Sequence, residues 1–412
     1  MSGARGISVS DAIARVRGAM ERLPSVDAAL GDAHGRVLTS DLLARADHPT
    51  ADDSALDGVA CRLADTVGAT GDDPVRLRWI GEVPAGRPFE GTVDPGEAAS
   101  IYTGGLMPNG ADGVVPVERL QRDGDDVWVR QPASLRDVRP RGQALRAGAL
   151  ALSAGTRLDA ARLALAASAG HGRVDVARAP RVVVIATGDE LMAAGATATG
   201  PGLSFESNGP GLTALAREAH ADVVRSERVG DDPDALRRCL DRAADDADLI
   251  VTSGGVSMGA RDHVRSLLER EGEVTFWRVA MKPGGPTLFG HWRGKPLLGL
   301  PGNPVASLLV FWLLGLPALQ ALEGELAPSP LAATWPARAG HGLQGATGRI
   351  HFARVRLRRE GDAWVADPVS TQSSGVLRSL TEADALAVLP PNGSPQPGDP
   401  IDVLPWRPAP HA

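Results

Sequence analysis

The apolar residues after Pro180 follow two alternating patterns. Short runs rich in Val, Ile and Leu are separated by amphipathic stretches with a helical period. Such runs, separated by about 10–15 helical residues, are typical of βαβ crossovers and a mostly parallel sheet covered on both faces. The pattern predicts strands at 181–186, 221–225, 248–252 and 274–280, and helices at 211–220, 233–244, 263–270 and 304–322.

The segments on either side of this region have different patterns. The N-terminal part contains helical stretches interrupted by a region of short β-like stretches with Gly, Pro and Asp turns, and the C-terminal part alternates apolar and polar residues after a Pro-rich linker. The predicted domains are an elongated helical and mixed N-terminal unit (1–48 plus 140–178), a β-rich insert (49–139), a doubly wound α/β domain (179–325) and a small β domain (326–412).

Composition and charge restrict the class of partner. The chain has 412 residues, of which 23% are charged, and a formal net charge of -7, so we expect no nucleic-acid partner and no anionic membrane surface. Cys61 and Cys239 lie far apart without CxxC spacing, which favours two plain core residues in a reducing cytoplasm. The longest apolar run, 305–319, is broken by Gly315 and Pro317 and is shorter than the ~20 residues of a membrane span, so it predicts a buried helix.

Polar and glycine-rich segments follow the predicted strands of the α/β domain. Ligands of open α/β sheets bind beyond the carboxyl ends of the strands, so these segments are where a site is expected. They are Thr187–Glu190, Gly230–Pro233, Ser253–Asp262, Lys282–Pro286 and Pro301–Pro304.

The stretch VTSGGVSMGARD at 251–262 predicts a phosphate-binding loop. Gly254 and Gly255 allow backbone N–H groups to approach phosphate oxygens, and Ser253 and Ser257 add hydroxyl donors. The N-terminus of the helix that follows adds partial positive charge. The alternative is an ordinary glycine turn.

Three acids are expected at the same edge of the sheet. Glu190, Asp232 and Asp262 would repel a phosphate unless a divalent cation lay between them, so Mg²⁺ with a nucleotide-like ligand is the simplest interpretation. Asp232, Asp262 and Asn303 also precede predicted helices and can act as helix caps. Capping does not exclude ligand binding, so both interpretations stay open.

Three other enzyme classes find little support in the sequence. No GxGxxG motif follows a predicted strand, GHWRGKP at 290–296 lacks the spacing and hydroxyl of a P-loop, and the nine histidines form no HxxxH or HExxH pair. A dinucleotide oxidoreductase, a P-loop enzyme and a zinc hydrolase are therefore disfavoured.

Eight short motifs, taken in order, span nearly the whole chain. They are DDSALDGVA (52–60), IYTGGLMPNGADGVV (101–115), VVIATGDEL (183–191), SN (207–208), DDPDAL (231–236), SGGVSMGARD (253–262), MKPGGP (281–286) and GLPGNPVAS (299–307). The set resembles the molybdopterin molybdenumtransferases, the MoeA and gephyrin E-domain family. One such motif is a common chance match, whereas eight in register are specific.

The resemblance implies an architecture and an activity. The implied fold is an elongated homodimer with a helical arm, a β-rich domain, a central MogA-like α/β domain and a C-terminal domain like a β-barrel. Members of the family insert molybdenum from molybdate into adenylylated molybdopterin and release AMP, with Mg²⁺ required. Molybdopterin adenylyltransferase and molybdoenzyme maturation factors are the implied partners, and the cytoplasm is the implied location.

The resemblance also assigns roles to individual residues. Asp57 matches an acid that faces the cleft of the partner subunit, and Arg349 and Ser374 match positions on the molybdate side. The candidate catalytic residues are Asp57, Glu190, Asp232, Asp262 and Lys282, of which Glu190, Asp232 and Asp262 are the candidate magnesium ligands. The candidate substrate-binding residues are Thr103, Thr187, Gly188, Ser253, Gly254, Gly255, Ser257, Pro286, Gly302, Asn303, Arg349 and Ser374.

Two departures from the family pattern bear on activity. Gly285 stands where the family has a lysine that would help to hold an oxyanion, and Gln143-Ala144 replaces an acidic pair. We favour a molybdenum insertase. The alternatives are a noncatalytic or weakly active relative that binds or delivers molybdopterin or the molybdenum cofactor and, less favoured, a molybdopterin adenylyltransferase.

Overall fold

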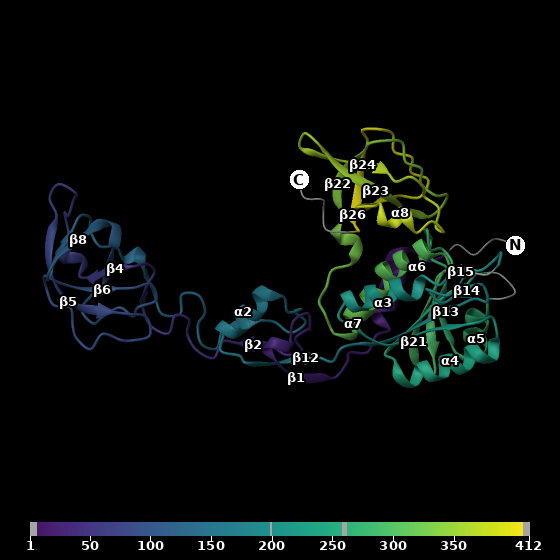
Figure 1. Ribbon diagram of the computed structural model, residues 1–412, viewed down its shortest axis with the longest axis horizontal. Helices are drawn as coiled ribbons and strands as arrows, with labels where there is room; N and C mark the ends of the chain where they lie inside the picture. Colours follow the sequence, from purple (N-terminus) through teal and green to yellow (C-terminus); the bar gives the residue numbers. More distant parts are fainter. Residues whose placement is uncertain (1–5, 198–199, 258–261, 407–412) are drawn as a thin grey trace.

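The molecule is elongated, with four parts arranged along its length (Figure 1). The computed structural model describes residues 6–197, 200–257 and 262–406. A β-rich domain lies at one end, an arm lies in the middle, and the α/β domain and the C-terminal β domain lie together at the other end. The predicted multidomain α/β and β fold is confirmed.

The central sheet is mostly parallel, as the sequence predicts. Its strands, in spatial order, are β16 (Asp222–Val229), β13 (Arg181–Thr187), β17 (Leu249–Ser253), β21 (Lys295–Leu300), β20 (Leu288–Trp292) and β18 (Glu273–Trp277). The first four are parallel, whereas β20 runs antiparallel to both of its neighbours. The hairpin β20–β21 is not among the predicted strands; its tight turn contains Arg293 and Gly294, both at positive φ.

Helices cover both faces of this sheet, because successive residues of a buried strand point to opposite faces. Val182 and Val184 of β13 join one cluster with helix α3 (Asn208–Glu218), while Val183 and Ile185 join the other. The second cluster is completed by α4 (Pro233–Asp246) and α5 (His263–Glu271). The core of the domain therefore lies in two layers.

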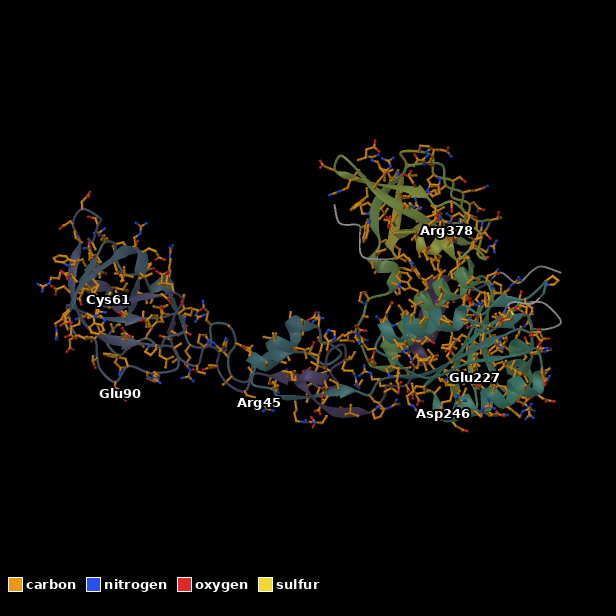
Figure 2. All side chains as sticks on the ribbon, viewed as in Figure 1. Arg45, Cys61, Glu90, Glu227, Asp246 and Arg378 are labelled. Carbon is orange, nitrogen blue, oxygen red and sulfur yellow. The ribbon has the colours of Figure 1, made fainter. Side chains whose placement is uncertain are left out.

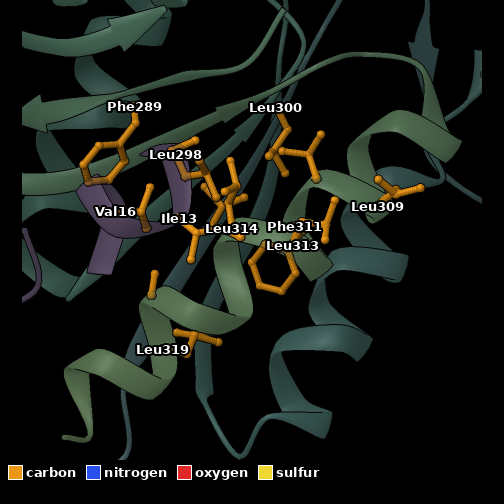
Figure 3. Packing of buried hydrophobic residues seen from close by; sticks show 14 of the residues in the cluster. Ile13, Val16, Phe289, Leu298, Leu300, Leu309, Phe311, Leu313, Leu314 and Leu319 are labelled. Atoms are coloured by element: carbon orange, nitrogen blue, oxygen red, sulfur yellow. The ribbon is translucent and has the colours of Figure 1, made fainter. Parts of the chain in front are cut away.

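Helix α1 (Val9–Gly18) packs on the central domain. Ile13 and Val16 lie among the apolar side chains of the long helix at 304–322, including Leu313 and Leu319 (Figure 3). The sequence groups residues 1–48 with the arm, but this part of the segment contributes to the core of the α/β domain.

The long apolar helix of the central domain is interrupted by a π-helical turn. It consists of α6 (Pro304–Val310), the π turn Phe311–Gly315 and α7 (Leu316–Leu322). By length and composition alone, the stretch Pro304–Leu322 could cross a membrane, but 78% of its most apolar window is buried inside the protein. It is therefore a core helix of this domain, as predicted.

The arm consists of two chain segments that run side by side. Strand β1 (Ser25–Ala29) pairs with β12 (Arg173–Ala177), and β2 (Leu42–Leu43) pairs with β11 (Leu150–Leu152). Helix α2 (Ala160–Ser168) packs on them through a small core of its own. The chain thus passes out through the arm and returns through it.

The β-rich domain is a six-stranded sheet inserted between the two arm segments. Its strands, in spatial order, are β7 (Gly113–Pro116), β4 (Gly58–Cys61), β6 (Glu97–Ile101), β5 (Val75–Val83), β9 (Asp126–Val129) and β8 (Leu120–Asp123). The entering and leaving segments pair as β3 (Asp53–Ser54) and β10 (Val138–Arg139), where the Arg139 guanidinium donates to both carboxylate oxygens of Asp53.

The cysteines lie in different domains and form no disulfide. Cys61 lies inside the β-rich domain (Figure 2), and Cys239 lies on α4. Both are free and buried. Burial is the main reason that the pKa of each thiol is raised to about 12, so both thiols are protonated core residues, as the sequence predicts.

The C-terminal domain is a closed five-stranded barrel. Its strands are β22 (Trp335–Ala339), β23 (Ile350–Glu360), β24 (Ala363–Pro368), β25 (Ala385–Leu389) and β26 (Pro400–Pro405), and α8 (Arg378–Thr381) precedes β25. Pairing of β23 with both β24 and β25 closes the barrel. A short strand of the central domain, β19 (Met281–Lys282), extends this sheet by pairing with the start of β23.

A buried ion pair joins the arm to the end of α7. The Arg157 guanidinium donates to Glu323 at 2.6 Å and to Glu325 at 2.8 Å, and its Nη1 donates to the Gly35 carbonyl. The Glu323 side chain is fully buried, whereas that of Arg157 is 21% exposed. Removing the arginine would leave a buried carboxylate without its cation.

We therefore predict that Arg157→Met lowers the free energy of unfolding by about 3–5 kcal/mol, the usual cost of breaking a buried pair on one side. The measurement is the unfolding transition in a denaturant series. Arg173→Met is the matched control, because the pair of Arg173 with Asp27 in the same arm is 60% and 57% exposed and is worth under about 1 kcal/mol. Equal losses in the two variants would contradict the prediction.

Candidate active site

A cleft of about 710 Å³ lies at the carboxyl edge of the central sheet. The register pairs Ala186 with Ser253 and Ser253 with Leu300, so three neighbouring parallel strands end at the same level. Ten of the residues selected from the sequence line this cleft: Thr187, Gly188, Glu190, Gly254, Gly255, Ser257, Asp262, Pro286, Gly302 and Asn303.

The glycine loop after β17 has a backbone that only glycine adopts readily. Gly254 and Gly255 have φ values of 97° and 68°. A Cβ at Gly254 would lie 2.6 Å from Thr187 Oγ1 and 2.7 Å from the Thr187 carbonyl oxygen. The loop is held onto α5 by the Arg265 N–H, which donates to the Gly255 carbonyl. Residues 258–261 of the same motif lie outside the described residues.

An aromatic side chain supports this loop from the edge of the sheet. The Trp277 indole N–H donates to the Val256 carbonyl at 2.9 Å. The Arg265 guanidinium lies 3.5 Å from the centre of the Trp277 ring, so α5 and β18 are joined behind the loop.

Asn208 connects the loops from below. Its side-chain amide donates to Ser253 Oγ at 2.7 Å and to the Gly302 carbonyl at 2.8 Å. Ser253 Oγ also accepts from the Ser307 hydroxyl at 3.2 Å, and Ser253 is only 2% exposed. Ser253 therefore lies beneath the cleft, where its hydroxyl ties the loops together.

The acids of the cleft are spread around its rim. Glu190 and Asp262 line it together with Asp231, whereas the side chain of Asp232 caps α4 by accepting from the N–H groups of Asp234 and Ala235. Asp189 fixes this turn, because its carboxylate accepts from the Asp231 N–H at 2.9 Å. The described residues contain no group of three His, Cys, Asp or Glu side chains that could hold a metal ion by themselves.

A second cavity of about 440 Å³ lies between the central domain and the barrel. Lys282 and Arg349 line it, so the two candidate oxyanion ligands of these segments share one cavity. Gln372 also lines it. No carboxylate is found among its described lining residues.

Two short segments connect the cavity to the cleft. In the first segment, Lys282 lines the cavity and Pro286 lines the cleft. In the second segment, Gln372 lines the cavity and Gly375 lines the cleft. An extended chain covers at most about 3.6 Å per residue, so four residues span under about 15 Å. Between Gln372 and Gly375, Ser374 accepts from the Asn303 side-chain amide at 3.0 Å, which anchors the second segment to the cleft.

Gly285 lies on the first of these segments in an ordinary conformation. A Cβ at this position would meet the Met281 carbonyl oxygen at 3.4 Å and Arg349 Nη1 at 3.7 Å, which are normal contact distances. The backbone therefore has room for a side chain where the family has lysine. The second departure, Ala144, is not among the residues that line the cleft, and its N–H donates to the His48 carbonyl.

Asp57 and Thr103 meet in the β-rich domain. The Asp57 carboxylate accepts from the Thr103 N–H at 2.7 Å and from its hydroxyl at 2.8 Å. These two hydrogen bonds, that of the backbone first, lower the pKa of the exposed Asp57 carboxyl. The domain lies at the opposite end of the molecule from the cleft of the same chain (Figure 1).

One wall of the cleft is formed by residues that were not predicted from the sequence. A small two-stranded ribbon, β14 (Leu191–Met192) with β15 (Ser204–Phe205), follows Glu190. Residues 200–203, between its two strands, are rich in Gly and Pro. The cleft residues absent from the candidate list are Leu191, Ser204, Phe205, Glu206, Ser207, Asn208, Asp231, Val256, Pro301, Pro304, Gly375 and Leu377. Seven of these lie within the motifs quoted from the sequence: Leu191, Ser207, Asn208, Asp231, Val256, Pro301 and Pro304. The other five gave no signal in the sequence: Ser204, Phe205, Glu206, Gly375 and Leu377.

The fold and the cleft define an enzyme-like α/β protein with a cleft at a parallel sheet edge, extended by an arm, a β-rich domain and a barrel. Three family models match in order: the MoeA N-terminal region, domains I and II (7–170), the probable molybdopterin binding domain (183–321) and the MoeA C-terminal region, domain IV (336–406). The chain belongs to the molybdopterin molybdenumtransferase family.

Named relatives and solved structures cover nearly the whole chain. Molybdopterin molybdenumtransferase 2 of Mycobacterium tuberculosis is 38% identical over 368 residues, covering 88% of this chain and 90% of that protein. The molybdopterin molybdenumtransferase of a Nostoc species is 34% identical, covering 87% of this chain and 83% of its own. The molybdopterin biosynthesis MoeA protein of Pyrococcus horikoshii superposes with a TM-score of 0.77 at 30% identity, covering 98% and 99%.

The geometry of the glycine loop leads to a stability prediction. Gly254→Ala should lower the free energy of unfolding by about 1–3 kcal/mol, because it places a Cβ against Thr187 in a backbone with positive φ. Gly302→Ala is the control, since its Cβ would approach only the Gly254 Cα, at 3.7 Å, and it should change stability by within about 0.5 kcal/mol. Thermal unfolding of both variants tests this, and equal effects would contradict the proposed steric cause.

Proposed function

We propose that the protein is a molybdenum insertase of molybdenum cofactor biosynthesis. It transfers molybdenum from molybdate to adenylylated molybdopterin and releases AMP, in the cytoplasm and with Mg²⁺. The observation that carries the proposal is the pair of adjoining sites: a glycine-lined cleft with acids at its rim, and a cavity lined by Lys282 and Arg349. A nucleotide-bearing pterin and a small oxyanion are substrates of matching size and charge.

The cleft would hold the phosphates of the pterin nucleotide. Positive-φ glycines shape the Gly254 loop at the carboxyl edge of the sheet, and α5 follows the loop. The Gly254 N–H itself donates to the Leu300 carbonyl, so other N–H groups of the loop would hold the phosphates. Asn208 and Trp277 keep this loop in position, so little reorganisation accompanies binding.

Magnesium fits the donor chemistry of the cleft rim. One or two of the acids Glu190, Asp262 and Asp231 would hold the ion together with phosphate oxygens and water, because Mg²⁺ usually takes one or two carboxylates and keeps several waters. When bound, it would neutralise charge on the phosphoanhydride. Asp232 would cap α4 next to these acids. It would bind the ion only if its side chain left the cap.

The second cavity would hold molybdate. Lys282 and Arg349 supply two positive charges, and the segments 282–286 and 372–375 lead from the cavity to the cleft. Pro286 and Ser374 lie on these segments, so they would border the path between the oxyanion and the pterin. Proximity of the two substrates would supply much of the catalysis.

The first test is the release of AMP by purified protein incubated with adenylylated molybdopterin, Mg²⁺ and molybdate. We expect AMP release that depends on molybdate, and an Asp262→Asn variant slower by about a hundredfold. Asp159→Asn, which preserves a capping residue of α2 in the arm, is the control and should match the wild type.

Other outcomes of this assay identify the alternatives. Tight binding of the adenylylated pterin without AMP release would support a carrier of molybdopterin. Consumption of ATP with unmodified molybdopterin would support an adenylyltransferase. Either result would exclude the insertase as the main activity.

We also propose that two copies form a dimer in which the Asp57–Thr103 pair completes the cleft of the partner subunit. The support is that this pair and the cleft lie at opposite ends of one chain (Figure 1). In a symmetric dimer, each β-rich domain would then act on the other central domain.

Mixing two inactive variants tests this arrangement. Asp57→Asn and Asp262→Asn, allowed to exchange subunits in equal amounts, should regain about a quarter of wild-type AMP release, because half of the dimers are mixed and each has one intact cleft. Each variant exchanged with itself is the control. Activity that stays at the sum of the two separate variants would show that Asp57 acts within its own chain or not at all.

A further inference from the structure

The cavity between the central domain and the barrel is lined by two basic residues, Lys282 and Arg349, and a third, Arg354, follows its lining residue Ala353 on β23. Among the described residues, no ion pair includes Lys282, Arg349 or Arg354. Arg354 on β23 is fully buried; its Nη2 donates only to the carbonyls of Thr371 and Ser373, and its Nε and Nη1 have no partner there. Burial lowers the pKa of Arg354 to about 10, which shows the cost of this unneutralised charge.

His351 in the wall of this cavity has a ring nitrogen without a partner. The residue is 3% exposed, and its Nδ1 lies 2.8 Å from the Gln344 carbonyl oxygen. A carbonyl can only accept, so Nδ1 carries the hydrogen, and in the neutral ring Nε2 is an acceptor. Nε2 is buried, and no hydrogen-bond partner for it exists among the described residues.

The surroundings of the ring favour its neutral form when the cavity holds no anion. Burial first, and then the charges of Lys282, Arg354 and Arg349, lower the pKa of His351. Lys282 belongs to β19, Arg349 immediately precedes β23, and Arg354 lies within β23. On the other sides, β25 places Leu389 opposite His351, and the lining loop 342–347 carries no titratable side chain.

We propose that binding of a tetrahedral dianion in this cavity is coupled to the uptake of one proton by His351 Nε2. A dianion would offset the charges of Lys282 and Arg349, which oppose protonation of the ring. Protonation would also make Nε2 a donor, and the dianion would then be the hydrogen-bond partner that Nε2 lacks. Molybdate is the dianion if the proposed function is right, and His351 is then a further residue of the oxyanion site.

Calorimetric titration of the full-length protein with molybdate tests the coupling. Titrations at neutral pH in two buffers with different heats of ionisation give the number of protons taken up per molybdate. We expect close to one proton for the wild type. His351→Gln should bind molybdate with no proton uptake, because an amide can donate N–H without titrating.

The affinity for molybdate should follow the same linkage as pH changes. Between the pKa of His351 in the free site and its higher pKa in the bound site, the wild-type Kd should rise by about tenfold per pH unit, because each binding event then takes a proton from solution. The Kd of His351→Gln should stay constant. His341→Gln is the matched control, since His341 lies in the same domain but is exposed and bonded to Asp367, and it should keep the wild-type slope.

The inference fails if wild-type protein binds molybdate without proton uptake, or if His351→Gln takes up as many protons as the wild type. If that variant does not fold, His351→Asn replaces it, and the wild-type pH slope remains a separate measurement. Molybdate-dependent AMP release without proton uptake would overturn the coupling and leave the insertase intact. Proton uptake without AMP release would support the coupling and overturn the insertase.

Discussion

The common level at which β13, β17 and β21 end is the constraint on which the candidate site depends. Parallel pairing sets Ala186 beside Ser253 and Ser253 beside Leu300, so three loops leave the sheet at one edge. Buried backbone groups there need hydrogen-bond partners, and the side chains of Asn208 and Ser253 donate to the carbonyls of Gly302 and Pro301. A shift in this register would move the glycine loop away from Thr187 and Gly302 and would remove the cleft.

The sequence predicts the parts of the structure that are set locally. The central strands are continuous apolar runs and the loops contain glycines at fixed offsets, so the positions of Gly254 and Glu190 at the sheet edge follow from pattern alone. The hairpin β20–β21 is not predicted because its turn uses Arg293 at positive φ, which carries no Asn-Gly signature. Helix α1 is assigned to the arm because periodicity shows an apolar face but not the surface that it covers.

The rest of the site is set by distant contacts that no local pattern contains. Asp231 rather than Asp232 lines the cleft, because the cap of α4 uses the second carboxylate. His351 becomes part of the proposed oxyanion cavity because β19 of the central domain pairs with the barrel and sets Lys282 beside it. Barrel closure pairs β23 with β25, which lie far apart in the sequence, so a local sequence pattern cannot predict that their residues are neighbours.

The ordinary conformation of Gly285 has an evolutionary consequence. Where the backbone conformation requires glycine, any replacement lowers the stability of the fold. Gly285 carries no such penalty, because the space around it already suits a side chain. A single substitution at Gly285 can therefore change the charge of the proposed molybdate side without any change in the backbone.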